Sequence, residues 1–294
     1  MKALRRAALA LLLLALSASA QQPQLPDNKG AVRFAVIGDT GTGDKHQYQI
    51  AALLKNYYDR YPFDFVLMMG DNLYGGESPD DYEKKFSRPY QPLLEKDVKF
   101  YAALGNHDDP AQRFYEKFNM GGKRYYTFKK GDVRFFALDS TYMDLEQLRW
   151  LEAELQKSND RWKICFFHHP LYSSGKRHGP DIELRQALEP LFLKYGVNAV
   201  FTGHEHFYER IRPQKGIYYF IEGGSAKLRE GNIGSRSEFT EKGEDQDNTF
   251  MVVEIEGDSL NFQTVRRDGQ TVDAGALPRL VNGQPVRATQ AAVK

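Results

Sequence analysis

Five short polar motifs could do chemistry, and each follows a stretch rich in apolar residues. They are Gly38-Asp39, Gly70-Asp71-Asn72-Leu73-Tyr74, Gly105-Asn106-His107-Asp108, His168-His169-Pro170 and Gly203-His204-Glu205-His206. In open α/β sheets, ligands bind outside the carboxyl ends of the strands, so motifs at five strand ends can converge on one site. Carboxylate and amide oxygens mixed with imidazoles suit iron, zinc or manganese rather than a thiolate-bound metal. The pattern therefore predicts a metal site.

Each motif taken alone has an ordinary structural explanation. A Gly-Asp pair is common in turns, and Asn or Asp side chains often stabilise loops. Other catalytic machinery is missing from the sequence, which has no Gly-x-Ser-x-Gly elbow and no Gly-x-x-x-x-Gly-Lys-Ser/Thr phosphate loop. The single cysteine, Cys165, lies inside an apolar run, so we interpret it as a small buried hydrophobic residue. The coincidence of all five motifs favours the metal site.

Strand-like and helix-like segments alternate along the chain and must position these motifs. Strands are predicted at residues 31–37, 63–69, 98–104, 125–128, 133–138, 162–167, 197–202, 217–221, 249–255 and 260–266. Helices are predicted through residues 50–57 and over 80–95, 145–156 and 181–195. Alternating strands and helices followed by further strands predict an α/β fold, one domain with two sheets.

Composition excludes several classes of protein. The 294 residues include 40 Lys and Arg against 39 Asp and Glu, a balance that argues against a nucleic-acid-binding protein. Hydrophobic residues make up 41% and charged residues 27%, which excludes a disordered chain. We therefore expect a globular protein that binds no nucleic acid. We also expect a monomer.

The N-terminus has the three-part pattern of a secretory signal peptide over residues 1–20. Lys2, Arg5 and Arg6 precede the apolar run 7–16, and Ala18-Ser19-Ala20 offers a cleavage site before Gln21. A membrane anchor is the alternative, but a spanning helix needs roughly 20 apolar residues. We expect export to a periplasm or the medium, an extended lead-in at 21–30, a domain at 31–267 containing a polar loop at 231–248, and a loosely held tail at 268–294.

Together the five motifs resemble those of the calcineurin-like metallophosphoesterases. Two positions narrow the resemblance to the purple acid phosphatases: Asp39-Thr40-Gly41 lacks the histidine of the more common Asp-x-His, and Tyr74 stands three residues after Asp71. Arg177-His178-Gly179-Pro180 resembles the His-Gly-Pro loop of the short, tartrate-resistant type. The similarity extends from about Val32 to Arg266. It implies a four-layer α/β/β/α sandwich of two mixed sheets flanked by helices.

The resemblance also implies two neighbouring metal ions. Fe(III) would be held by Asp39, Asp71, Tyr74 and His206. A second, divalent metal (Fe, Zn or Mn) would be held by Asp71, Asn106, His168 and His204, so that Asp71 bridges the pair. His168 is preferred to His169 because the family ligand stands two residues before the proline. His107 and His178 would face the substrate, and Asp108 could orient His107.

The implied function is an exported acid phosphatase that hydrolyses phosphomonoesters, with nucleotides and phosphoproteins among the candidate substrates. Hydroxide generated at the metals would attack phosphorus, and His107 would assist the leaving group. Departures from the family are Thr40 in place of a tryptophan, a short 139–145 connection and an unpaired Cys165. Two alternatives stay open: a phosphodiesterase or nucleotidase of the same superfamily, and a non-catalytic exported protein that binds metal or phosphate.

Overall fold

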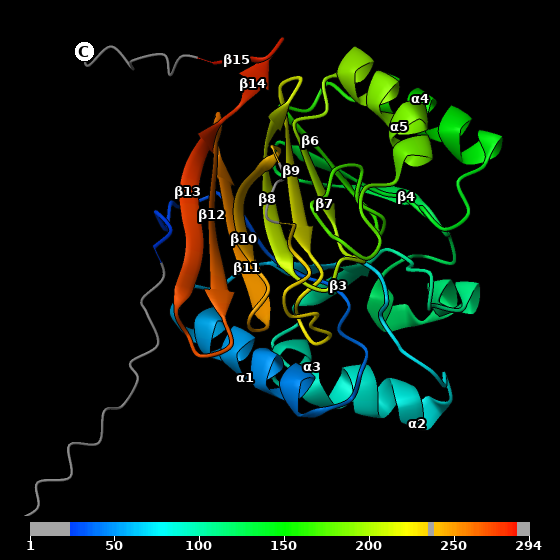
Figure 1. The fold of residues 1–294 in the computed structure, drawn as a ribbon, viewed down its shortest axis with the longest axis vertical. Coiled ribbons are helices and arrows are strands. Elements are labelled where there is room, and N and C mark those ends of the chain that lie inside the picture. Colours follow the sequence, from blue (N-terminus) through cyan, green and yellow to red (C-terminus); the bar gives the residue numbers. More distant parts are fainter. Residues whose placement is uncertain (1–23, 235–237, 287–294) are drawn as a thin grey trace, which may run out of the picture.

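Two β-sheets packed face to face form the centre of the fold (Figure 1), in a computed structural model that describes residues 24–234 and 238–286. The first sheet has six strands in the order β13-β12-β11-β1-β2-β3. Their bounds are β1 Val32–Ile37, β2 Phe65–Met68, β3 Lys99–Ala102, β11 Thr249–Glu256, β12 Ser259–Arg266 and β13 Thr271–Pro278. The β1–β2 and β2–β3 pairs are parallel and the other pairs are antiparallel, so the sheet is mixed.

The second sheet has seven strands in the order β10-β8-β9-β7-β6-β5-β4. Their bounds are β4 Tyr126–Lys130, β5 Val133–Ala137, β6 Trp162–Phe166, β7 Ala199–Thr202, β8 Tyr208–Gln214, β9 Ile217–Glu222 and β10 Thr240–Glu244. The central strands β5, β6, β7 and β9 run parallel, and antiparallel partners flank them. A short hairpin of β14 (Leu280–Val281) and β15 (Gln284–Pro285) follows β13.

Aromatic side chains fill the space between the two sheets. The ring of Phe34 on β1 meets those of Phe135 on β5 and Phe201 on β7 edge-on, with centroids 5.4 Å and 6.0 Å apart. Phe65 on β2 meets Phe135 in the same way at 5.3 Å. Such T-shaped contacts are preferred between aromatic rings. Strands covered on both faces read as nearly continuous apolar runs, which is why these segments were visible in the sequence.

Helices cover the outer faces of both sheets (Figure 1). On the first sheet lie α1 (Lys45–Arg60) and a helical region made of α2 (Pro79–Tyr82), a π-helical turn (Glu83–Ser87) and α3 (Arg88–Leu94). On the second lie α4 (Leu145–Lys157) and α5 (Ile182–Tyr195), whose leucines pack on that sheet. Two short 3₁₀ helices, Pro110–Phe114 and Glu116–Phe118, lead from β3 towards β4. The predicted α/β/β/α arrangement is confirmed.

Two segments expected to lack regular structure contain strands. The tail expected from residue 268 includes β13, which pairs with β12 over Ser259–Arg266, and the polar loop expected at 231–248 includes β10. Strand β8 was also not predicted. All three lie at or near a sheet edge. Strands β8 and β10 carry many polar side chains, and β13 consists mostly of small or exposed ones, so none shows clear apolar alternation and each depends on pairing with a neighbouring strand.

The signal-peptide prediction at 1–20 falls outside the described residues. Within the described part of the chain, no helix is both long enough and apolar enough to cross a membrane.

Candidate metal centre

The carboxyl ends of strands from both sheets meet at one place, and all five motifs follow strands that end there. Two hydrogen bonds tie the sheets together at this point. The backbone N–H of His204, after β7, donates to Oδ2 of Asp39, after β1, at 2.8 Å. The Nδ1 atom of His168, after β6, lies 2.8 Å from the carbonyl oxygen of Met69, after β2. The predicted convergence therefore involves both sheets.

Three of the predicted ligands have backbone conformations that are rare for residues with a side chain. The φ angles of Asp39, Asp71 and His204 are 54°, 51° and 69°. Positive φ is uncommon outside glycine and costs free energy, and such strain concentrates at functional sites. The glycine before His204 is also required, because a Cβ at Gly203 would lie 2.6 Å from Oδ2 of Asp39. Local strain and close approach thus aim these side chains at one another.

The first predicted ligand set is assembled in the structure. The hydroxyl of Tyr74 donates to Oδ1 of Asp39 at 2.9 Å and lies 3.3 Å from Nε2 of His206. The same Nε2 atom lies 3.3 Å from Oδ1 of Asp39. Burial first, and then the carboxyl groups of Asp39 and Asp71, raise the pKa of Tyr74. A proton therefore occupies the phenol here, and a cation of high charge would have to replace it for Tyr74 to act as a phenolate ligand.

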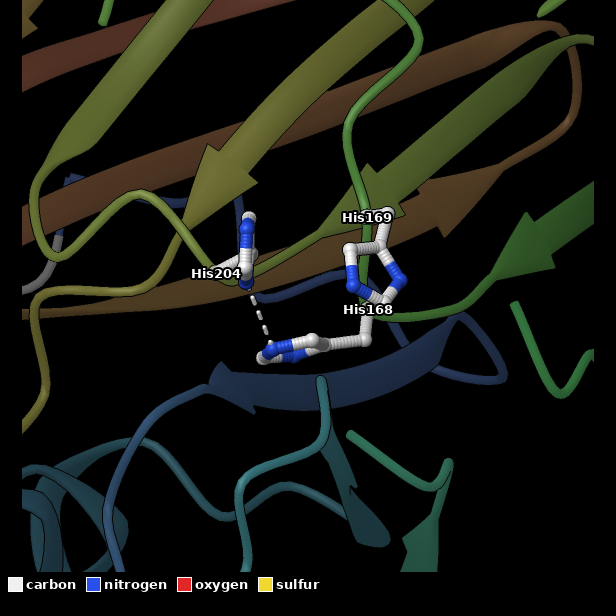
Figure 2. Close-up of side chains that lie close together, drawn as sticks. All are labelled: His168, His169 and His204. Atoms are coloured by element: carbon white, nitrogen blue, oxygen red, sulfur yellow. Dashed lines mark hydrogen bonds between the residues drawn. The ribbon is translucent and has the colours of Figure 1, made fainter. Parts of the chain in front are cut away.

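The second predicted set lies beside the first. Nε2 of His168 lies 3.0 Å from Oδ1 of Asn106, 3.1 Å from Nδ1 of His204 and 3.4 Å from Oδ1 of Asp71. Figure 2 shows the contact between His204 and His168 from two different loops. Burial lowers the pKa of His168, lowers that of His204 to about 2 and lowers that of His206 to about 4. Neutral imidazoles keep the lone pairs that metals require.

Asp71 provides the clearest indication that the donor set fits a metal. Its side chain is buried, and Oδ1 accepts a hydrogen bond from the backbone N–H of His107 at 3.0 Å. Oδ2 has no hydrogen-bond partner among the residues that the structure describes. A buried carboxylate oxygen without a partner is costly. Burial, and then the adjacent Asp71, also raise the pKa of Asp39. A cation shared by the two carboxyl groups would relieve both penalties, and candidate ligand atoms of Asp39, Asp71 and His168 lie within 4.8 Å of one another.

His169, which was not predicted to be a ligand, also lies close to His168 and His204. One possible ligand atom from each of His168, His169 and His204 lies within 4.8 Å of the other two, and Figure 2 shows the three side chains grouped together. However, Nδ1 of His169 lies 2.9 Å from the hydroxyl of Ser140, on the loop after β5. His169 is therefore held by Ser140 through Nδ1, whereas His168 contacts Asp71 directly.

The two histidines predicted to face substrate are both exposed. The ring of His107 packs 5.0 Å from that of Tyr74, and the ring of His178 packs 4.3 Å from that of His204. They therefore stand over different ligand sets, His107 beside the first and His178 beside the second. Burial and the neighbouring Arg229 lower the pKa of His178.

The expected contact between Asp108 and His107 is not formed in the described structure. The buried Asp108 carboxyl instead accepts hydrogen bonds from the backbone N–H groups of Gly105, Asn72 and Leu73, at 2.8, 3.1 and 3.0 Å. Side-chain amides of Asn72 and Gln112 add two more. Asp108 therefore holds the Asp71–Tyr74 loop against the Asn106 loop, because its buried position lets it satisfy several backbone donors at once.

Several residues of the site were missed from the sequence. A sixth strand end, after β9, places Lys227 with its Nζ 4.4 Å from the centre of the Tyr74 ring. The signal was Gly223-Gly224, which follows the predicted strand 217–221 after one residue and has no accompanying Asp or His. Lys227 also lines a hollow of about 560 Å³ next to Tyr74, formed with Thr42, Asp44, His46, Ala226, Leu228 and Glu230.

Known proteins are similar to this chain in sequence. Residues 32–208 match the family described as calcineurin-like phosphoesterase. Purple acid phosphatase 17 of Arabidopsis thaliana is 29% identical over 244 residues, covering 69% of this chain and 71% of that protein. Human tartrate-resistant acid phosphatase type 5 is 25% identical over 307 aligned positions, covering 87% of this chain and 94% of that protein.

Solved structures share the fold. The purple acid phosphatase PPD1 from yellow lupin seeds superposes with a TM-score of 0.72 at 18% identity, over 90% of this chain and 58% of that one. GAP50, described as the anchor in the inner membrane complex of Plasmodium, gives a TM-score of 0.76 at 20% identity, over 86% and 90% of the two chains.

Proposed function

The chain belongs to the calcineurin-like phosphoesterase family, and on this basis we propose that it is an acid phosphatase that hydrolyses phosphomonoesters at a pair of metal ions. One observation carries the proposal. The buried Asp71 carboxyl, one oxygen of which lacks a partner in the described part of the chain, lies between two donor sets that each include imidazole. An exposed histidine packs beside each set. A purely structural cluster would not need the exposed histidines.

The donor sets differ in hardness, and this favours two different cations. Asp39, Tyr74 and His206 offer a carboxylate, a phenolate and an imidazole, which suit Fe(III). Asn106, His168 and His204 offer a neutral amide and two imidazoles, which suit a divalent Fe, Zn or Mn ion. Asp71 would be shared by both cations. When bound, the two cations supply Lewis-acid activation of the phosphoryl group and of the attacking water.

The chain's own residues would bind phosphate and move the proton. His178 stands beside His204 and adds positive charge for phosphate when it is protonated, which its lowered pKa restricts to acid. His107, held by its backbone N–H on Asp71 and by its ring on Tyr74, would give a ring proton to the departing ester oxygen. Asp108 would act as a positioning residue for both loops, not as the partner of His107.

A phosphodiesterase or nucleotidase remains the second candidate because of the hollow beside Tyr74. Its volume of about 560 Å³ could receive a second group on the phosphate, and Lys227 offers it a cation. Export is proposed from the signal-like residues Lys2 to Ala20 alone.

Paired substrates test these assignments. Metal-loaded protein should hydrolyse p-nitrophenyl phosphate faster than bis(p-nitrophenyl) phosphate, with higher activity in acid than at neutral pH, and a chelator should abolish both activities. Faster diester hydrolysis would support the second candidate. If metal-loaded protein binds inorganic phosphate and hydrolyses neither ester, the chain is a non-catalytic binder.

A further inference from the structure

Glu205 stands between two predicted metal ligands, His204 and His206, but its carboxyl group turns to other loops. The side chain is fully buried. Oε1 accepts a hydrogen bond of 2.5 Å from the backbone N–H of Gly179, the residue after His178. Oε2 accepts one of 2.9 Å from the side-chain amide of Asn232. One carboxylate therefore joins the β7 strand end to two loops.

The loop that contains Gly179 leaves room for the Glu205 carboxylate at Gly175. A Cβ on Gly175 would overlap the carboxyl group of Glu205, so the loop packs directly on it. Asn232 connects the two loops again, because its Oδ1 accepts from the backbone N–H of Arg177 at 3.1 Å and its carbonyl accepts from that of Lys176 at 2.9 Å.

The loop so held is the one that carries His178. That histidine is exposed and its ring lies 4.3 Å from the ring of His204. Its position therefore depends on the backbone on either side, at Arg177 and Gly179, and both of those N–H groups are bound within the Glu205–Asn232 network. Loss of the carboxylate would leave a backbone donor unsatisfied, which favours movement of the loop towards water.

We propose that Glu205 is a positioning residue that fixes His178 beside His204 and thereby sets the affinity of the site for the phosphate group of the substrate. The claim about phosphate rests on the proposed phosphatase function, whereas the claim about the loop does not. Glu205 touches neither the substrate nor the reacting atoms, and it acts through the Gly179 N–H.

A double-mutant cycle with His178 separates positioning from a general loss of structure. In Glu205→Ala, we expect both metals to be retained, with KM for p-nitrophenyl phosphate and the inhibition constant of inorganic phosphate each raised about 10-fold and kcat changed less. The double variant Glu205→Ala/His178→Ala should have a KM no more than about 2-fold above that of His178→Ala alone. The two effects do not add, because Glu205 acts only through the position of His178. Glu205→Gln keeps an acceptor for Gly179 and should restore most of the affinity.

Glu189→Ala is the matched control. Glu189 is also a buried carboxylate with two partners, Tyr172 and Lys215, and it contacts none of the predicted ligands. The Glu189→Ala substitution should leave KM and the inhibition constant of inorganic phosphate unchanged. The proposal would be overturned if the effects of the Glu205 and His178 substitutions on phosphate affinity multiplied in the double variant. Loss of metal from Glu205→Ala would also overturn it.

Hydrogen exchange gives a readout that needs no activity. Amides of residues 176–179 should exchange faster in Glu205→Ala than in wild type or Glu189→Ala. Unchanged exchange there would overturn the positioning role even if the protein proves to have no phosphatase activity. Faster exchange with no hydrolysis by wild type would support the loop contact and refute the phosphatase function alone.

Discussion

The hydroxyl of Tyr74 donates a hydrogen bond of 2.9 Å to the carboxyl group of Asp39, and these residues come from loops after two neighbouring parallel strands. The pairing places a phenol and a carboxylate, two hard oxygen donors, on the same side of His206.

Tyr74→Phe should abolish the colour of the iron-loaded protein. A phenolate bound to ferric iron gives a visible charge-transfer band, and the substitution removes only the hydroxyl while the ring still packs against His107 and Lys227. The measurement is a visible spectrum of both proteins at matched iron content. A band of unchanged intensity in the variant would show that Tyr74 is not the ligand.

His107→Ala should leave the metals in place and slow turnover. A general acid typically contributes about 10²–10⁴-fold, so the loss should reach that range for esters with poor leaving groups and be smaller for p-nitrophenyl phosphate. A series of aryl phosphates of rising leaving-group pKa measures this. Equal losses across the series would restrict His107 to binding phosphate.

Glu222→Gln should flatten the pH dependence of stability in the metal-free protein. Burial raises the pKa of Glu222 from 4.5 to about 8. The unfolded chain therefore ionises this group at a lower pH than the folded chain does, and the folded state loses stability as pH rises from about 4.5 to about 8. Each unit of difference between the folded and unfolded pKa values changes the free energy of unfolding by about 1.4 kcal/mol.

Urea denaturation of metal-free wild type and Glu222→Gln across that range provides the test. The wild type should lose more stability than the variant with rising pH, because the amide does not titrate. Parallel slopes for the two proteins would mean that Glu222 has an ordinary pKa in the folded state.

Asp273→Ala should destabilise the protein through the strand that was expected to be a loose tail. Asp273 lies on β13 and its carboxyl accepts hydrogen bonds from Tyr208 at 2.8 Å and Arg210 at 2.7 Å, both on β8. Removing it leaves a buried hydroxyl and a partly buried guanidinium without this partner, at a cost of about 3 kcal/mol. Chemical denaturation measures the change, with Asp268→Ala, in the exposed turn before β13, as a control. Equal stabilities would mean that β13 contributes little.

The strand ends and most of the site residues could be predicted because their signals are local. A buried strand is an apolar run, and a Gly followed by Asp, Asn or His at its end is visible in a few residues of sequence. The β13 strand was missed because an edge strand with one buried side chain, Asp273, has no apolar alternation. Its stability depends on pairing with β12, which is not encoded within the strand itself.

The supporting contacts of the site are long-range and for that reason could not be predicted. Asp108 stands next to His107 in the sequence, yet its carboxyl binds Asn72 and Leu73 from the preceding motif. Glu205 stands between two histidines, yet it binds Gly179 and Asn232. The sequence neighbours of Asp108 predicted the wrong partner, and those of Glu205 predicted none. In both cases the carboxyl group turns away from its own loop and accepts hydrogen bonds from donors on another loop.

Metal analysis of wild type and Asp71→Asn tests the central claim most directly. Asp71 is the residue whose carboxyl lies against His168 on one side and raises the pKa of Asp39 on the other, so a single carboxylate would serve both cations. Wild type should bind two metal ions per chain, whereas Asp71→Asn should bind fewer than one and lose phosphatase activity. Asp144→Asn, at the N-cap of α4, should keep both ions. Two tightly bound ions in Asp71→Asn would contradict a bridged metal pair.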